Sequence, residues 1–332
     1  MKIVVFGSQR RVGLWEGDTV VDVNNATAAY FASQKMSAAE AEAKAAAVAP
    51  ADLAAFIAAG KDALDFARKA AAHVKGSQDG TLVQPISLVK LQAPWPRRRI
   101  FCAAANYGQH VADAQTNFGK PMTRQQVEEA MRKRDPEGFT KTPVEAMGPD
   151  DDLLYPSRTT QLDYEAELTV VIGAHGRDIP LAEAKNYIWG LTLGNDLSVR
   201  DGTQFTKFPA SFNFLKNFDG SAIFGPCILV DDSDPQNIDI TLEVNGDVRQ
   251  DYNTDQMIYS FAEYISYISK DFTLVPGDLI MGGAAAGTAA DLCKRHPDGT
   301  PINLDFFLKV GDVVEIKSPK IGTLRNRIVA KQ

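Results

Sequence analysis

Short apolar runs separated by polar turns open the chain, and they give way to longer helical periodicity. Residues 1–23 alternate in the way that predicts a small β-meander. Residues 37–76 are rich in alanine and begin with the spacing of a capping box, which predicts helix. Prolines and polar residues over 84–100 then predict a linker. We therefore expect a small N-terminal α+β domain over residues 1–90.

Short strands dominate the sequence after this linker. An Asn-Gly pair at 245–246, between two apolar runs, indicates a tight hairpin. The segment at about 113–158 breaks the texture because it is polar, charged and irregular. It suits either a lid over a site or a surface insertion. The pattern predicts an α+β fold that is mostly β, with a larger domain over residues 95–332 that contains this insertion.

The acidic balance of the chain narrows its partners. Its 332 residues carry a net charge of −7, which argues against a general nucleic-acid binder. Three widely spaced cysteines, Cys102, Cys227 and Cys293, favour neither a disulfide framework nor a zinc site. No apolar run is long enough for a signal peptide or a membrane span. We expect a soluble, cytoplasmic protein, and an anionic small substrate stays open because a bound metal can reverse the local field.

The candidate chemistry begins on one strand. An apolar run follows Glu167, and residues two apart on a strand share a face, so Asp163, Glu165 and Glu167 project together. Neighbouring carboxylates repel and raise one another's pKa, and a bound cation removes that cost. Hard oxygen ligands favour Mg²⁺, Mn²⁺ or Ca²⁺ over zinc. A solvated acidic face at a strand end is the alternative that this stretch alone leaves open.

Two further segments place charged residues beside apolar runs. Asp196 ends one apolar strand, and Arg200 follows closely behind it. Lys216 stands between Leu215 and Phe218, an unusual setting for a lysine whose ammonium has no partner. Near a metal, this lysine is suited to bind or polarise a substrate carboxylate or oxyanion. The alternative is a lysine that snorkels to the surface.

A histidine follows another predicted strand. His110 and Asp113 stand three residues apart, which is one helical turn. A carboxylate at that distance can fix the imidazole tautomer and make the histidine a better base. A structural histidine is the alternative.

Taken in order, these segments resemble the fumarylacetoacetate hydrolase superfamily over roughly residues 95–330. Each segment is weak alone, but seven in the family's order are highly specific. They are Asn-Tyr-x-x-His at 106–110, Glu-x-Glu at 165–167, Asn-Asp-x-Ser-x-Arg-Asp at 195–201, Lys-x-Phe-Asp at 216–219, Val-Asn-Gly-Asp-Val-Arg-Gln at 244–250, Leu-Val-Pro-Gly-Asp at 274–278 and Ile-Gly-Thr-Leu-Arg-Asn at 321–326.

The resemblance implies a mixed β-sandwich or roll, a homodimer and a metal-dependent enzyme. It implies Mg²⁺ or Mn²⁺ held by three carboxylates, a lysine beside the metal, a base that activates water, a carboxylate that orients this base, and contacts to the substrate. These roles fall in turn on Glu165, Glu167 and Asp196; on Lys216; on His110; on Asp113; and on Tyr107, Arg200, Gln204 and Ala284.

Two departures from the family pattern bear on the substrate. Ala284 stands where a threonine is expected to meet the substrate carboxylate, and Gln204 sits one place beyond the usual glutamine. We expect hydrolysis of a C–C bond in a 2,4-diketo acid or related oxo-acid, through water deprotonated by His110 and a metal-stabilised enolate. Metal-dependent decarboxylation or isomerisation–hydration of an oxo-acid, with the same ligands, is the alternative.

Overall fold

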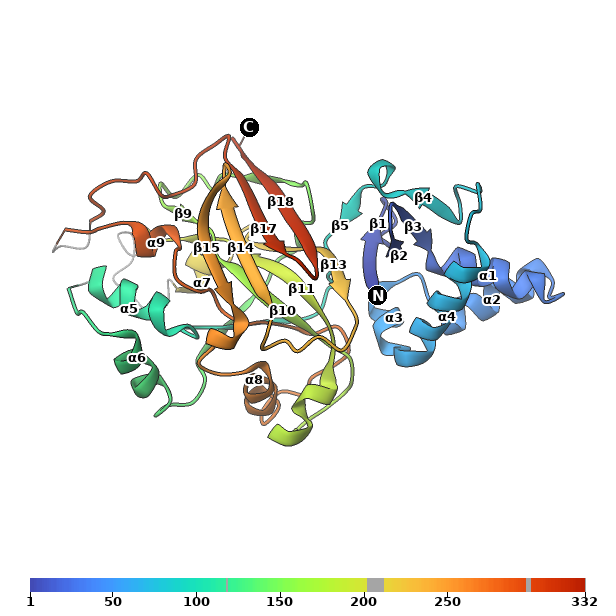
Figure 1. Cartoon of the computed structure of the whole chain (residues 1–332), viewed down its shortest axis with the longest axis horizontal. Helices are drawn as coiled ribbons and strands as arrows, with labels where there is room; N and C mark the ends of the chain where they lie inside the picture. The colour runs from blue at the N-terminus through green and yellow to red at the C-terminus, as the bar shows by residue number, and fades with distance from the viewer. Residues whose placement is uncertain (118, 202–211, 297–299, 332) are drawn as a thin grey trace.

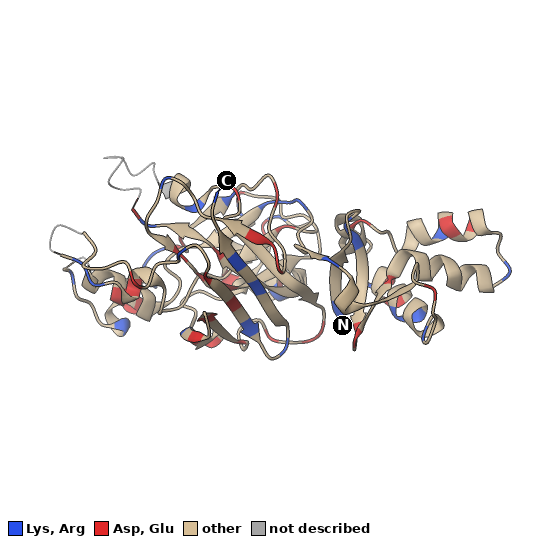
Figure 2. Cartoon of the chain, turned by 90° about the horizontal axis from the view of Figure 1, so that it is seen from above, with Lys and Arg blue, Asp and Glu red and all other residues tan. Residues whose placement is uncertain are grey.

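The computed structural model describes residues 1–332 except 118, 202–211, 297–299 and 332, so Gln204 lies outside the described residues. A smaller N-terminal part and a larger body lie side by side along the long axis of the molecule (Figure 1). Acidic and basic residues are interspersed along its length (Figure 2). Within the described ranges, no helix is both long enough and apolar enough to cross a membrane.

The N-terminal part is a strand meander followed by helices, as the sequence predicts. Asp22 ends the meander and caps the first helix, since its carboxylate accepts from the backbone N–H of Asn25 at 2.9 Å. The predicted capping box is confirmed at Ser37 and Glu40, where the second helix begins. The elements are β1 (Lys2–Phe6), β2 (Arg11–Glu16), β3 (Thr19–Asp22), α1 (Val23–Ser33), α2 (Ala38–Val48), α3 (Leu53–Ala58), α4 (Gly60–His73), β4 (Val83–Pro85) and β5 (Leu91–Gln92).

One central sheet runs through both parts of the molecule. Its strands follow the order β4-β3-β2-β1-β13-β11-β10-β16-β6-β7, and β5 also pairs with β1. β1 pairs with β13 through Lys2 and Ile3. The two predicted domains, residues 1–90 and 95–332, therefore contribute strands to the same sheet. The strands of the larger body are β6 (Ile100–Ala103), β7 (Gly138–Lys141), β10 (Ala166–Ile172), β11 (Ile188–Asp196), β13 (Ala222–Leu229) and β16 (Leu279–Met281).

A second sheet, in the order β15-β14-β17-β18-β8, packs against the first (Figure 1). Residues of both sheets, such as Leu193 and Ile316, share one buried core. Asn245 and Gly246 have φ angles of 54° and 86°, so the predicted tight hairpin between β14 and β15 is confirmed. The strands are β8 (Asp152–Leu154), β14 (Asp239–Val244), β15 (Asp247–Asn253), β17 (Val313–Ser318) and β18 (Gly322–Val329). The predicted α+β fold, mostly β, is therefore confirmed.

The predicted irregular insertion at about 113–158 contains ordered elements. β7 pairs antiparallel with β6 at the edge of the central sheet, and β8 pairs parallel with β18. Both strands are too short for an alternating pattern to show in the sequence. The remaining elements among the described residues are α5 (Gly108–Asn117), α6 (Arg124–Met131), α7 (Phe212–Lys216), α8 (Phe261–Ile268), α9 (Ala289–Leu292), the short strands β9 (Leu162–Asp163) and β12 (Ser198–Val199), and 3₁₀ turns at Ile86–Leu88, Leu181–Tyr187 and Thr254–Gln256.

Candidate metal centre and its cavity

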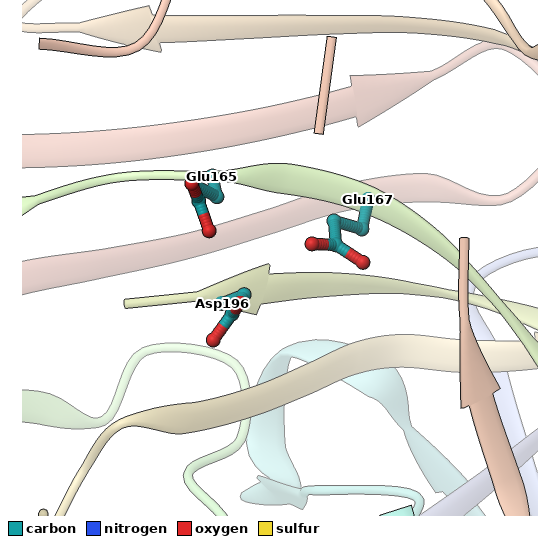
Figure 3. A group of neighbouring side chains, drawn as sticks. All are labelled: Glu165, Glu167 and Asp196. Carbon is teal, nitrogen blue, oxygen red and sulfur yellow. The ribbon is translucent and has the colours of Figure 1, made fainter. Parts of the chain in front are cut away.

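Three buried carboxylates meet where two antiparallel strands run side by side. β10 pairs with β11 in the register Ala166↔Asn195, which brings the residues around that pair together. Ligand oxygens of Glu165, Glu167 and Asp196 all lie within 4.8 Å of one another (Figure 3). The three residues are 4%, 1% and 1% exposed, so the solvated strand end that the sequence left open is excluded.

The electrostatics of this cluster favour a bound cation. Burial, and then repulsion from Asp196 and Glu165, raise the pKa of Glu167 well above its usual value. Burial would also raise the pKa of Glu165, but Arg200 and Lys216 outweigh it and the pKa falls well below the usual value. Within the described part of the chain, the ion pairs of this cluster reach Glu165 and Asp196 and leave Glu167 without one. Three buried carboxylates can supply oxygen ligands, and Glu167 has no ion-pair partner in the described residues. This arrangement fits a hard divalent cation.

Two cations from the segments singled out in the sequence balance part of the charge. Lys216 is 5% exposed; its Nζ donates to Asp196 Oδ2 at 2.7 Å and also to Glu165 Oε2. Arg200 donates from Nη2 to Glu165 Oε1, and from Nε to Asp163 Oδ2 at 2.8 Å. Burial would lower the pKa of Lys216, but Asp196 and Glu165 outweigh it and the pKa is raised. The lysine is a buried cation, so the snorkelling alternative is wrong.

Sequence reasoning misses a third buried cation, Lys141. Its ammonium is fully buried at the end of β7 and donates to Asp196 Oδ1 and to the backbone carbonyl of Lys216, both at 2.5 Å. The polar composition of this segment indicates surface, which hides the lysine from a pattern search. A usable signal is Phe139, which stands two residues earlier on the same strand and hence on the same face.

The partner of His110 is Asp291, which corrects the predicted pairing with Asp113. His110 Nδ1 lies 2.7 Å from Asp291 Oδ2, whereas Asp113 accepts from Gln109 Nε2 at 2.8 Å on the same helix. The pairing differs because α9 packs against α5 and places its own carboxylate at the imidazole. Burial would lower the pKa of His110, but the Asp291 carboxylate outweighs it, so the pKa is raised.

Asp163 positions the helix that carries Asp291. Its carboxylate accepts from the backbone N–H groups of Ala289 at 2.7 Å and Ala290 at 3.1 Å, in the first turn of α9. Thr288 and Asp291 form a capping box at the same helix start. That Thr-x-x-Asp spacing is the sequence signal that could have pointed to Asp291. β9 ends at Asp163 and β10 begins at Ala166, so the predicted single strand through the three acidic residues is interrupted. Asp163 supports the helix that carries Asp291 and does not join the carboxylate cluster.

The carboxylates open into a cavity of about 420 Å³, called here the carboxylate cavity. The backbone N–H of Gly283 donates to Glu167 Oε2 at 2.8 Å, so the segment before Ala284 supports a candidate ligand directly. Glu137 and Phe139 reach the cavity from the predicted insertion, and neither was singled out in the sequence. Besides the three carboxylates, the lining includes His110, Arg200, Lys216, Glu137, Phe139 and Ala284.

Tyr107 is not among the residues that line the carboxylate cavity, contrary to the predicted substrate contact. It is buried, its ring packs edge-to-face on Tyr252 with 5.3 Å between centroids, and it lines a neighbouring pocket of about 220 Å³. The backbone of Tyr107 bridges to Met257 just before α5 begins, which places its side chain against β15. Arg200 and Ala284 both line the carboxylate cavity, and their contacts to a substrate stay predictions.

Comparison with known proteins matches most of the chain to one family. Residues 99–329 match the family described as fumarylacetoacetate (FAA) hydrolase, C-terminal. The chain is 33% identical over 254 residues to a fumarylacetoacetate hydrolase domain-containing protein 2 homolog of Dictyostelium discoideum, covering 74% of this chain and 75% of that protein. It is 32% identical over 286 residues to the oxaloacetate tautomerase YisK of Bacillus subtilis, covering 84% and 87%.

Solved structures extend the similarity to the N-terminal part. The fumarylacetoacetate hydrolase of Exiguobacterium antarcticum matches with a TM-score of 0.72 and 25% identity over 100% of both chains. The 5-carboxymethyl-2-hydroxymuconate delta-isomerase of Mycobacterium smegmatis matches with a TM-score of 0.60 and 29% identity, over 76% of this chain and 84% of that one. With the family match over most of its length, the chain belongs to the fumarylacetoacetate hydrolase superfamily.

Proposed function

We propose that the chain is a divalent-metal-dependent enzyme that moves a proton at the carbon beside the carbonyl of a small oxo-acid, as in keto–enol tautomerisation of oxaloacetate. The observation that carries the proposal is the His110–Asp291 pair, whose imidazole lines the same cavity as the three carboxylates. The names of two relatives support it, since one is an oxaloacetate tautomerase and another a delta-isomerase.

His110 is suited to take and return the proton. Its Nδ1 faces the Asp291 carboxylate, so Nδ1–H donates there and Nε2 is left as the acceptor for a substrate proton. Asp291 is itself fixed, because its Oδ2 also accepts from the backbone N–H groups of Gly287 at 3.1 Å and Thr288 at 3.2 Å. The orientation of the imidazole is therefore set by the fold before a substrate arrives.

The residues around the base suit the charge that develops when the proton leaves. Glu165, Glu167 and Asp196 would hold a divalent cation, which when bound supplies positive charge to the oxygens of an oxo-acid and so favours enolisation. Lys216 presents a fixed ammonium at the cavity wall, where it can donate to a developing oxyanion. Phe139 and the neighbouring alanines give the rest of the wall an apolar character.

Hydrolysis of a C–C bond, the activity expected first from the sequence, is the second candidate. It is favoured by the match to a fumarylacetoacetate hydrolase over the whole chain. Hydrolysis needs a water held between His110 and a carbonyl carbon, in addition to the groups that enolisation uses. The two activities therefore differ in their products more than in their residues.

The test follows products with and without metal. Protein stripped with EDTA is given the enol form of oxaloacetate, with and without added Mg²⁺ or Mn²⁺, and enol loss is followed by ultraviolet absorbance. Metal alone and the His110→Ala variant are the controls, and products are identified by mass. Protein- and metal-dependent loss of the enol with the carbon skeleton intact supports the proposal. Two shorter acids from a 2,4-diketo acid would establish the hydrolase instead, and no metal-dependent reaction of either substrate would refute both.

A further inference from the structure

A second polar cavity, called here the arginine pocket, lies at the junction of the two parts of the molecule. It has a volume of about 230 Å³ and shares no lining residue with the carboxylate cavity. Figure 1 shows β1 and α3 on the side of the N-terminal part nearest the larger body. Residues Trp95, Pro96 and Arg97 of the linker to β6 also line the pocket. Its charged lining is Arg10, Arg11, Arg97 and Asp52.

Two of these arginines occupy an unfavourable backbone conformation. Arg10 has a φ of 53° and Arg97 a φ of 58°, in the left-handed region that side chains with a Cβ rarely adopt. Arg10 lies in a turn and Arg97 at a bend, and the chain carries arginine at each position although glycine would remove the strain. Residues in such conformations cost free energy and persist only where the surrounding structure imposes them. They are often found at ligand sites.

Arg10 is held by backbone carbonyls and not by a carboxylate. Its Nη2 donates to the backbone carbonyls of Ala93 at 3.0 Å and Trp95 at 3.2 Å, and it forms no ion pair with any carboxylate in the described ranges. Arg11 is bound to Asp22 at 2.5 Å, and Arg97 to Glu145 at 2.7 Å.

The groups around Arg10 also shift its pKa. Burial, and then the charge of Arg97, lower the pKa of Arg10. Asp52 is the acidic residue of the lining. Its Oδ1 accepts a hydrogen bond from the backbone N–H of Ala55 at 2.9 Å, which caps α3. Glu145, Asp151 and Asp52 act on the pKa of Arg10 in the opposite direction. In the described ranges, the half-buried Arg10 guanidinium thus has carboxylates around it but none paired with it directly.

We propose that the arginine pocket binds a small anion through carboxylate or phosphate oxygens held between Arg10 and Arg97. The planar guanidinium group matches the geometry of both oxyanions and can donate to two oxygens at once. The Arg97–Glu145 pair is exposed, with side chains 56% and 53% accessible, so little is lost when Arg97 turns to a ligand. The bound anion would join the turn after β1 to the linker that continues into β6.

The experiment measures binding and does not depend on the proposed enzymatic activity. Metal-loaded full-length protein is titrated calorimetrically with inorganic phosphate, and separately with succinate, in sodium chloride of matched ionic strength. Arg10→Gln is expected to raise the Kd at least tenfold, because a charge-assisted hydrogen bond to the ligand is lost. Arg10→Lys keeps the charge but not the fork, so an intermediate Kd is expected. Arg98→Gln removes a charge from the same linker outside the pocket and should leave the Kd unchanged.

The outcomes separate the ligand classes and the alternatives. Phosphate binding that depends on Arg10 assigns a phosphate site, and succinate binding with that dependence assigns a carboxylate site. Succinate heat that survives in Arg10→Gln belongs to the carboxylate cavity and overturns the carboxylate form of the proposal. Equal losses in Arg10→Gln and Arg98→Gln would show a general charge effect and overturn the proposal. So would the absence of binding by both probes to a wild-type protein whose circular dichroism shows it folded.

Discussion

Replacing Lys141 by methionine removes a buried ammonium while keeping much of the side-chain volume. In the structure this ammonium donates to Asp196 Oδ1 and to the backbone carbonyl of Lys216, both at 2.5 Å. The ammonium also donates, at 3.4 Å, to the backbone carbonyl of Leu197. The variant therefore removes this donor from one carboxylate oxygen and two carbonyls, in a place that water does not reach. It tests whether the ammonium of Lys141 compensates the negative charge of the candidate metal ligands.

The size of the effect should depend on metal. Removing one partner of a buried ion pair typically costs about 3–5 kcal/mol. We expect about 3 kcal/mol without metal, the lower end of that range, because Lys216 still donates to Asp196 Oδ2 at 2.7 Å. With a divalent cation on Asp196, the remaining cost is the loss of the donor to the Lys216 carbonyl, about 1 kcal/mol, since the bond to Leu197 is long at 3.4 Å. The difference of about 2 kcal/mol means that the variant binds metal about 30-fold more tightly than wild type.

Urea unfolding of wild type and Lys141→Met, each stripped with EDTA and each saturated with Mg²⁺, measures all four free energies. Lys120→Met is the matched control, because Lys120 is exposed in the same segment and its loss should change stability by less than about 0.5 kcal/mol. Calorimetric titration with Mg²⁺ gives the affinity independently. An equal loss of stability with and without metal, or weaker Mg²⁺ binding by the variant, would refute the reasoning.

The remaining predictions concern the base and the assembly. His110→Ala should lower kcat by about 10²–10⁴-fold with Mg²⁺ still bound, and an unchanged rate would remove His110 from its role. Asp291→Asn should lower kcat by a similar factor of about 10²–10⁴ because the tautomer is no longer fixed, whereas Asp113→Asn should not; equal effects would restore the predicted pair. Because His110 must be neutral to act and its pKa is raised, kcat/KM should rise with pH through a pKa above the usual histidine value, and this limb should move to lower pH in Asp291→Asn. A homodimer, implied only by the family resemblance, should appear in sedimentation, and a monomer would refute it.

The carboxylate cluster could be read from the sequence because it depends on one strand and its neighbour. The alternation of a strand places Glu165 and Glu167 on one face, and an apolar run that ends in Asp196 indicates a second strand of the same sheet. Lys216 was readable because a lysine in an apolar setting needs a partner. Both inferences depend on the periodicity of the strand and on the apolar neighbours of a charged residue, which are visible in a short stretch of sequence.

The pairing of His110 with Asp291 and the position of Lys141 could not be predicted in this way. Asp291 reaches His110 across 181 positions of sequence, and its place depends on how α9 packs against α5. The helical spacing of His110 and Asp113 gave a local answer, but tertiary packing overrides a single-turn contact. Lys141 was hidden because β7 has only four residues in a polar segment. Contacts between distant segments are set by packing, which no single window of the sequence shows.

The strand pairing between β1 and β13 has a consequence for how the molecule unfolds. Lys2 and Ile3 cover part of one edge of β13, and Phe56 of α3 packs edge-to-face on Trp189 of β11 with 6.2 Å between centroids. A chain cut at residue 99, where the family match begins, would bare this edge and offer a template for intermolecular strand addition. We therefore expect both parts to melt in a single cooperative transition. An N-terminal part exchanged between relatives would have to supply a strand that pairs with β13.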